Sequence, residues 1–173
     1  MKKRRFFALF LVLGLLVSLL SVPASAFEEI DVDARAALLV EKETGEILYE
    51  KNAHEKNYPA SITKLTVALL VFEAIDAGQL SLDQPITAHE SAFEGLSIYG
   101  STAGIKVGEV LTVEQLLQCM LIVSANEACN ILAEWDAGSI AAFVDAMNAT
   151  AKALGCENTH FVNPSGLHDP DHY

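Results

Sequence analysis

The chain has 173 residues, a formal net charge of −12 and a hydrophobic content of 51%. An excess of acidic residues argues against nucleic-acid binding, which depends on Lys and Arg against phosphate. It also argues against attachment to a membrane surface through a polybasic segment. The length suits one ordinary domain, and the sequence shows no internal repeat. We therefore expect a single globular domain and no nucleic-acid partner.

The first residues have the composition of an export signal. Residues 2–5 are basic, residues 6–22 form an almost unbroken apolar run, and residues 24–26 read Ala-Ser-Ala. This pattern predicts a secretory signal peptide over residues 1–26. The alternative is an uncleaved anchor, since the run approaches the length of a bilayer span, but Pro23 and the small residues favour cleavage. Cleavage would remove four of the 11 basic and none of the 23 acidic residues, which leaves a net charge of −16.

The next predicted elements are a hairpin and a helix. Residues 36–40 have the composition of a buried strand, and residues 47–50 that of a returning strand after a turn. From Ser61 to Ala77, apolar side chains recur at helical spacing, and Gly78 stands where a helix commonly ends. The recurring residues, which such spacing assigns to the core, are Ile62, Leu65, Leu69, Phe72 and Ile75.

Three more helices are predicted in the second half of the chain. Thr112 to Gln115 match a capping box, and Ser139 is a candidate N-cap. A long irregular loop precedes these helices, and loops of this length inside a domain tend to be functional. The predicted elements are a turn and short extended piece over 80–87, the loop over 88–108, helices over 113–121, 127–135 and 140–154, and an extended piece over 159–162 before a turn at 163–166.

The sequence gives little support for metal or redox chemistry. Its three cysteines cannot all pair within the chain, and no CxxC pair is present. Cys119 and Cys129 lie in apolar helical stretches, where a free thiol behaves as a small buried hydrophobe. Residues 168–172 contain His and Asp without a fixed ligand spacing, and we interpret them as a polar surface turn. We expect no metal and no cofactor, and we interpret Trp135 as a core residue.

The candidate nucleophile is Ser61, the only serine in the sequence that is followed three residues later by a lysine, Lys64. This spacing places both side chains on one face of the first helical turn. Lysine can take the serine proton only if its amine is neutral, so burial or nearby positive charge must lower its pKa. The Ser61 N–H, at the start of the helix, would be an oxyanion donor. The alternative is an N-cap serine beside a solvated lysine.

A second candidate pair is Ser124 and Asn126, which interrupt an apolar helical pattern. In the functional interpretation, the Ser124 hydroxyl relays a proton between Lys64 and the leaving group. The Asn126 amide then holds a substrate carbonyl or the lysine side chain. The alternative is an ordinary turn between two helices, because both residues cap helices well.

Together these motifs resemble those of serine-type D-alanyl-D-alanine carboxypeptidases, the low-molecular-mass penicillin-binding proteins. The matching segments, in the family's order, are PASITK at 59–64, LTVEQLL at 111–117, SANEA at 124–128 and THFVNPSGLHD at 159–169. The resemblance implies that Ser61 forms an acyl-enzyme with a peptidoglycan stem pentapeptide and releases its terminal D-alanine. Lys64 would accept the proton, and Ser124 and Asn126 would complete the second motif. β-Lactams would acylate the same serine, and the protein would act at the cell envelope, in the periplasm or cell wall.

The sequence departs from the family pattern at three points. Ala125 replaces the usual central Gly of the second motif, and Ser165 stands where His is common. The family's Lys-Thr-Gly motif, which anchors the substrate carboxylate and supplies an oxyanion N–H, does not occur in the sequence. We therefore expect residues 27–173 to be the N-terminal portion of the catalytic domain, inactive alone and with an uncovered apolar face on its helical layer. Any membrane association would use the missing C-terminal region.

The implied fold class is α/β (α+β), of the serine β-lactamase/DD-peptidase type. Its antiparallel sheet lies beside a helical subdomain, and the C-terminal part of that sheet would be missing here. One rival function is a class A β-lactamase, which needs a glutamate-bearing loop to activate the deacylating water. We find no convincing glutamate of that kind after Asn126. The other rival is a non-catalytic envelope-binding module of the same fold.

Overall fold

The structure is a computed structural model that describes residues 31–173. The predicted signal peptide at 1–26 lies outside these residues. The chain divides after His54 into two compact units, which are described separately below. In the described part of the chain, no helix combines the length and the apolar character needed to cross a membrane.

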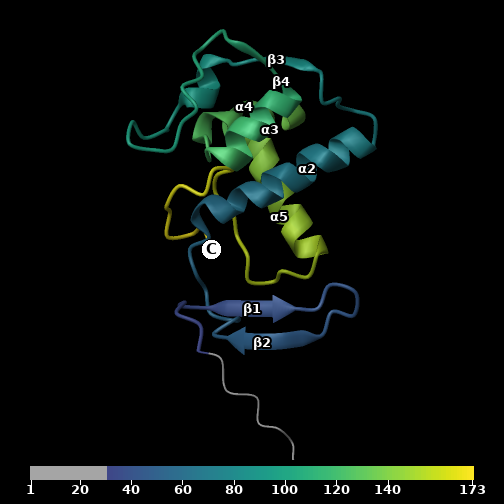
Figure 1. Cartoon of the computed structure of the whole chain (residues 1–173). Coiled ribbons are helices and arrows are strands. Elements are labelled where there is room, and N and C mark those ends of the chain that lie inside the picture. Colours follow the sequence, from purple (N-terminus) through teal and green to yellow (C-terminus); the bar gives the residue numbers. More distant parts are fainter. Residues whose placement is uncertain (1–30) are drawn as a thin grey trace, which may run out of the picture. The chain divides into compact units, whose positions relative to one another are not determined.

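The described part of the first unit is a β-hairpin, as predicted. Strand β1 (Ala37–Val40) pairs antiparallel with β2 (Ile47–Lys51), as Figure 1 shows. In the connecting turn, the Glu41 carboxylate accepts hydrogen bonds from the backbone N–H groups of Glu43 and Thr44. The expectation that the first strand is buried is wrong, because the apolar side chains of both strands are largely exposed. Two strands alone provide no second layer that could cover either face of the sheet.

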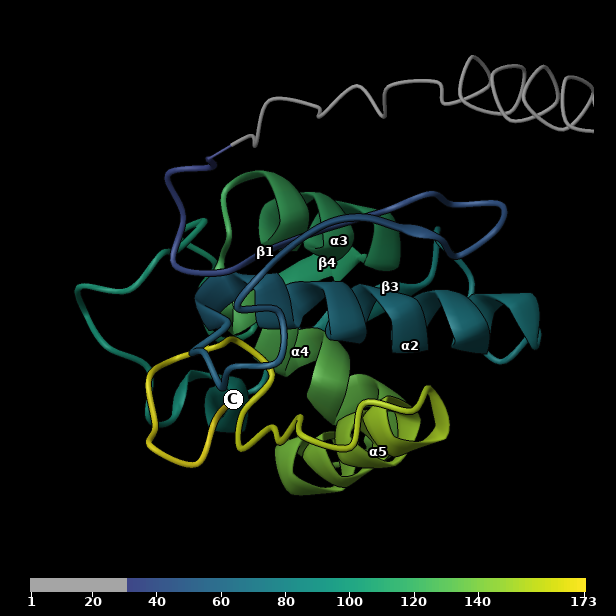
Figure 2. The same cartoon turned by 90° about the horizontal axis from the view of Figure 1, so that it is seen from below.

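The second unit, residues 55–173, is a bundle of helices around the helix α4. Helix α4 contacts the other three α-helices, and most of its residues are buried. Figure 2 shows these helices from below. The elements are η1 (Ala60–Thr63), α2 (Lys64–Asp76), β3 (Pro85–Thr87), η2 (Glu90–Phe93), β4 (Val110–Thr112), α3 (Val113–Ile122), α4 (Asn126–Ala137) and α5 (Ile140–Ala153), where η marks a 3₁₀ helix and β3 pairs antiparallel with β4.

The first helix of this unit exists as predicted, but it buries a different face. Ser61 lies in the 3₁₀ turn η1, and α2 begins only at Lys64. The predicted stripe is mostly exposed, with Ile62 at 68% and Leu65 at 63%. The buried residues of η1 and α2 are Thr63, Lys64, Val67, Ala68, Val71 and Ala74. Because α2 is apolar on several sides, helical periodicity alone could not choose between its faces.

An apolar stripe of η1 and α2 is therefore exposed in the described part of the chain. Leu69 and Phe72 continue it along the helix, at 38% and 45% exposure. The remaining helix boundaries follow the sequence signals closely. Thr112 and Gln115 form the predicted capping box at the start of α3, and the Ser139 side chain caps α5.

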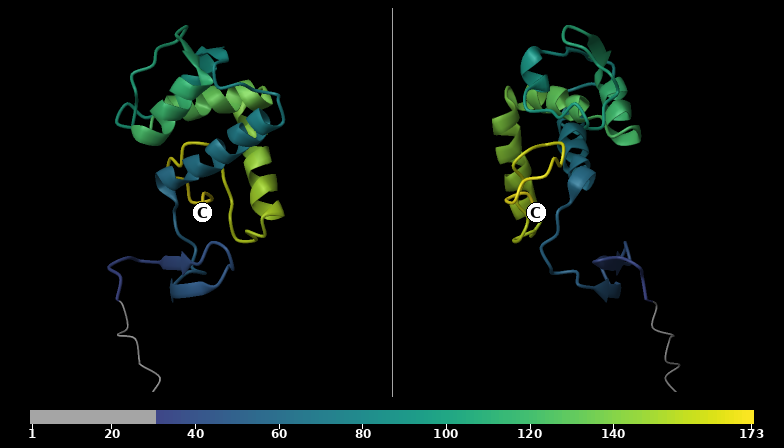
Figure 3. Two further views of the ribbon diagram at one scale, coloured as in Figure 1. Left: turned by 45° about the vertical axis from the view of Figure 1, so that its right-hand side comes forward. Right: turned by 90° about the vertical axis from the view of Figure 1, so that its left-hand side faces the viewer.

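The last segment of the chain agrees only in part with the prediction. The piece predicted over 159–162 is not assigned as a strand, but His160 exchanges two backbone hydrogen bonds with Tyr173. Residues 168–172 are not simply a polar surface turn, because His172 is 2% exposed. Figure 3 shows this final segment (yellow) beside the start of α2.

The prediction that Trp135, in α4, is a core residue is also wrong, since it is 37% exposed.

Candidate active site

The candidate nucleophile lies in a tight turn. Ser61 is exposed within η1, and the preceding residue, Ala60, has a φ of 47°. This left-handed conformation is uncommon for a residue with a side chain. It turns the chain sharply into α2. The exposed Ser61 and the buried Lys64 then belong to the same turn of the chain. The predicted pairing of hydroxyl and amine is thus present, although it spans a 3₁₀ turn and the start of an α-helix.

The Lys64 amine has three oxygen neighbours. Its Nζ lies 3.1 Å from Ser61 Oγ, and it donates to Asn126 Oδ1 at 3.0 Å and to the Ser165 carbonyl at 2.8 Å. The side chain is almost fully buried, at 2% exposure. A neutral amine has two N–H donors and one lone pair. The amide and carbonyl oxygens can take both donors, which leaves the lone pair for the Ser61 hydroxyl proton.

Burial favours the neutral form of this amine. Desolvation lowers the pKa of Lys64 below its ordinary value, and it outweighs the opposing effects of Cys129 and Glu127. The condition that the sequence placed on a lysine base, a pKa lowered by burial, is therefore present in the structure. The solvated lysine of the alternative interpretation is not what the structure shows.

Ser124 lies between α3 and α4 and points at the nucleophile. Its Oγ donates to Ser61 Oγ at 2.9 Å. Ser124 has a φ of 61°, so the two non-glycine residues of this unit with a left-handed backbone, Ala60 and Ser124, both border the site. Ala125 has a φ of −58° and a fully buried side chain. That conformation does not require glycine, so the departure from the family pattern at this position causes no strain.

Asn126 is fixed through both its side chain and its backbone. Its Oδ1 accepts from Lys64, and its backbone N–H donates to the Ser101 carbonyl at 2.9 Å. Gly100 packs against the amide so closely that a Cβ there would lie 2.7 Å from Asn126 Nδ2. The four predicted site residues, Ser61, Lys64, Ser124 and Asn126, are therefore connected by hydrogen bonds. A plain interhelical turn would not explain these contacts.

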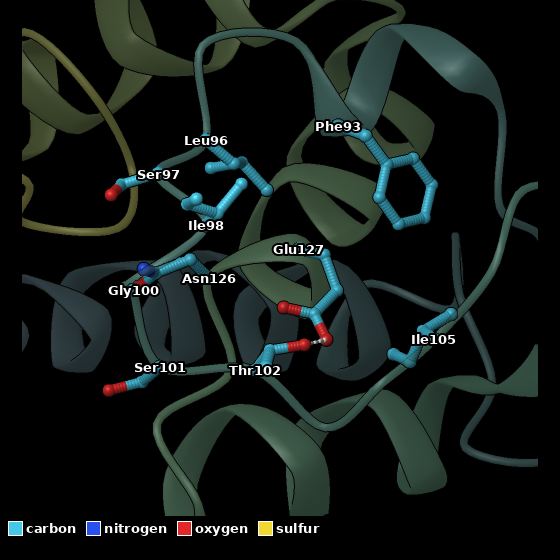
Figure 4. Close-up of a pocket in the computed structure, with 10 residues that line it drawn as sticks. All are labelled: Phe93, Leu96, Ser97, Ile98, Gly100, Ser101, Thr102, Ile105, Asn126 and Glu127. Atoms are coloured by element: carbon cyan, nitrogen blue, oxygen red, sulfur yellow. Dashed lines mark hydrogen bonds between the residues drawn. The ribbon is translucent and has the colours of Figure 1, made fainter.

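A pocket of about 210 Å³ adjoins Asn126, between α4 and the loop over residues 93–105. Figure 4 shows its walls and Glu127 with a carboxylate oxygen bonded to Thr102. The same oxygen accepts from the backbone N–H groups of Ala103 and Gly104 at 2.7 and 3.2 Å. Glu127 therefore anchors the loop that the sequence marks as functional. This role was not predicted, since nothing local in the sequence indicates which distant amides a glutamate will bind.

The turn at 163–166 also contributes to the site, in a way that the sequence did not indicate. The turn at 163–166 was predicted, but not its contact with Lys64 through the Ser165 carbonyl. Asn163 Oδ1 accepts from the backbone N–H of Gly166 at 2.8 Å and stabilises the turn. Gly166 has a φ of 82°, and a Cβ there would lie 1.8 Å from the Ala60 carbonyl oxygen. Only glycine allows this close approach between the turn and the nucleophile.

The site as a whole is suited to nucleophilic chemistry. A serine hydroxyl lies between a second hydroxyl and a buried amine, and two polar loops flank it. Residues 31–173 contain no group of three or more His, Cys, Asp or Glu side chains that could hold a metal ion. The residues that meet at the site instead fit acyl transfer through a covalent intermediate, in which a base activates the serine.

Comparison with known proteins agrees with this chemistry. A profile of the family described as D-alanyl-D-alanine carboxypeptidase matches residues 23–173. The chain is 38% identical over 165 residues to the D-alanyl-D-alanine carboxypeptidase DacF of Bacillus subtilis, a match that covers 91% of this chain and 42% of the relative. It is 37% identical over 145 residues to the carboxypeptidase DacC of Escherichia coli, covering 82% of this chain and 36% of that protein.

Solved structures confirm the predicted fold class. The D-alanyl-D-alanine carboxypeptidase DacD of Francisella tularensis superposes with a TM-score of 0.79 at 40% identity, over 84% of this chain and 35% of that one. Penicillin-binding protein 5 of Haemophilus influenzae superposes with a TM-score of 0.81 at 30% identity, over 85% of this chain and 43% of that one. The chain thus spans less than half the length of these relatives.

Proposed function

The chain belongs to the D-alanyl-D-alanine carboxypeptidase family, and from this membership we propose that Ser61 removes the terminal D-alanine of peptidoglycan stem pentapeptides. The observation that carries the proposal is the position of Ser61 Oγ, 3.1 Å from Lys64 Nζ and 2.9 Å from Ser124 Oγ. A hydroxyl held between a buried amine and a second hydroxyl has both a base and a route for its proton.

In the acylation step, the Ser61 hydroxyl proton passes to Lys64 Nζ. The freed oxygen attacks the carbonyl carbon of the penultimate D-alanine, whose oxygen takes up the electron pair and is stabilised by the Ser61 backbone N–H. Collapse of this intermediate breaks the peptide C–N bond. The leaving nitrogen takes a proton that Lys64 returns through Ser124, and the Asn126 amide holds the substrate backbone.

Deacylation reverses these roles. Lys64 takes a proton from water, the water oxygen attacks the ester carbon, and the C–O bond to Ser61 breaks as Ser61 regains a proton. A β-lactam follows the same first step, because its ring amide takes the place of the scissile peptide bond. Its leaving nitrogen stays tethered to the acyl group, so the adduct persists and the compound acts as a covalent inhibitor.

The proposal concerns the whole protein, because this chain spans less than half the length of the curated relatives it matches. The 173-residue sequence contains no Lys-Thr-Gly, the motif expected to bind the substrate carboxylate and supply the second oxyanion N–H. Loss of one oxyanion donor lowers turnover by about 100- to 1,000-fold. We therefore expect residues 27–173 alone to be inactive. We further propose that the protein is exported through residues 1–26 and acts on cell-wall peptidoglycan.

Treatment of the whole protein with a penicillin, followed by intact-mass measurement, tests the proposal. We expect one covalent adduct on the peptide that contains Ser61. Ser61→Ala should abolish the adduct and lower D-alanine release from a pentapeptide by at least about a thousandfold. Ser81→Ala, which changes an exposed serine outside the site, serves as the matched control.

Three results would contradict the proposal in different ways. D-alanine release that survives Ser61→Ala would show that the nucleophile is wrong. Rapid turnover of the penicillin adduct would favour a β-lactamase over a carboxypeptidase. Complete absence of an adduct and of D-alanine release in the unaltered protein would favour a non-catalytic envelope-binding module.

A further inference from the structure

A buried histidine lies directly behind the nucleophile turn and has no part in the proposed mechanism. His172 is 2% exposed, and its Nε2 lies 2.8 Å from Thr63 Oγ1. Its Nδ1 accepts a hydrogen bond from the Val162 backbone N–H at 3.2 Å. The ring of Phe161 packs against it edge-on, with 5.6 Å between the ring centroids. Both polar atoms of the imidazole are thus used inside the fold.

These contacts determine the tautomer of the ring. An Nδ1 that accepts from the Val162 N–H carries no proton, so the proton of the neutral imidazole is on Nε2. The Nε2–H group then donates to Thr63 Oγ1. His172 is therefore a neutral bridge with one donor and one acceptor, each directed at a different chain segment.

The bridge joins the two segments that form the site. Thr63 lies between Ser61 and Lys64 in sequence and is itself buried. Val162 belongs to the segment that continues to Ser165, whose carbonyl holds the Lys64 amine. The segment is fixed on its other side as well, since Asn148 of α5 bonds both backbone groups of Phe161 at 2.8 Å.

We propose that His172 is a positioning residue that ties the Ser61–Lys64 turn to the segment carrying the Ser165 carbonyl. The proposal rests on the function proposed for Ser61 and Lys64. Without the bridge, the turn is still held by the buried Lys64–Ser165 hydrogen bond and by the contact between Gly166 and Ala60. The Thr63 side chain then loses its hydrogen bond to His172, so the turn is held less firmly and Ser61 can move relative to Lys64 Nζ.

The neutral state of His172 is supported by its surroundings. Burial is the main cause that lowers its pKa, and the neighbouring His160 acts in the same direction. Asp169 acts in the opposite direction and favours the protonated ring. On the Thr63 side of the ring, the nearest ionisable residue in sequence is Lys64. A proton on Nδ1 would face the Val162 N–H, so two donors would meet and the bridge would break. The bridge is therefore expected to fail in acid.

The test compares His172→Ala, His172→Gln and Thr63→Val in the full-length protein. The readout is the rate of penicillin acylation per folded molecule, with the thermal midpoint measured in parallel. Displacement of reacting groups by about 1 Å costs on the order of 100-fold in rate. We expect His172→Ala and Thr63→Val each to slow acylation by about 10- to 100-fold. His172→Gln keeps an amide donor for Thr63 and should recover most of the rate.

His172→Gln should also remove the loss of acylation that protonated His172 causes at acid pH. His89→Gln, an exchange of an exposed histidine, is the matched control. Normal acylation by folded His172→Ala and Thr63→Val would overturn the inference while the proposed function stands. Absence of an adduct in the unaltered protein would instead overturn the proposed function. Nitrogen chemical shifts of the His172 ring test the bridge independently, and a protonated Nδ1 at neutral pH would also overturn the inference.

Discussion

The close approach between Gly166 and the nucleophile turn leads to a sharp prediction for Gly166→Ala. The new Cβ would lie 1.8 Å from the Ala60 carbonyl oxygen and 2.3 Å from its carbon. Real Cβ atoms do not come within 3.0 Å of such atoms, so the two segments must separate by at least 1.2 Å, the difference between 3.0 and 1.8 Å. The φ of 82° adds about 1–2 kcal/mol of backbone strain for alanine.

This separation moves the Ser165 carbonyl away from Lys64 and loosens the base. A displacement of that size is expected to slow penicillin acylation on the order of 100-fold. Stopped-flow acylation and thermal unfolding of the full-length variant provide the measurements. Gly155→Ala is the matched control, since Gly155 has a φ of 81° with nothing within 4 Å of its Cβ position. It should share the strain but acylate normally. Acylation of Gly166→Ala within about threefold of the unaltered protein would refute the reasoning.

Three other predictions follow from the buried ionisable groups. Because the pKa of Lys64 is lowered in the folded state, the unfolded chain binds more protons between that pKa and the ordinary 10.5, so stability should rise with pH across this window. Lys64→Met should remove this slope in pH-dependent melts. An unchanged slope would show that the buried Lys64 amine is not its cause. Glu127→Gln should weaken charge-assisted hydrogen bonds worth about 1.5–3 kcal/mol each, so amide exchange at Gly104 should accelerate at least about tenfold, and unchanged exchange would count against the anchor. Burial raises the pKa of Cys129 to about 12, so a maleimide should label the exposed Cys156 while Cys129 stays unlabelled until the protein unfolds.

The sequence predicts those features of the fold that have local causes. The capping box at Thr112, the Ser139 N-cap and the glycine that ends α2 each depend on neighbouring residues, and all three occur as expected. The buried face of α2 does not have a local cause. It depends on which side meets α4, and the exposed Ile62 and Leu65 show that apolar spacing alone selected the wrong side.

The same distinction applies to the site. Ser61 and Lys64 are three residues apart, so their proximity can be read from the sequence. The contacts of Lys64 with Asn126 and Ser165 span 62 and 101 residues. Asn126 was already a candidate partner of the lysine, because it interrupts an apolar helical pattern, but the Ser165 contact is made by a backbone carbonyl, which any residue possesses. Such a contact leaves no trace in residue type, and for that reason sequence reasoning missed it.

The left-handed backbone at Ala60 has a consequence for how this protein would respond to selection for heat resistance. Glycine adopts that conformation freely, so Ala60→Gly releases about 1 kcal/mol held in the turn. The same exchange widens the conformational range of the residue that precedes the reactive alcohol. Variants enriched at high temperature should accumulate glycine at this position and, through the Ser61 chemistry proposed above, acylate more slowly, because thermal tolerance and reactivity make opposite demands on one peptide unit.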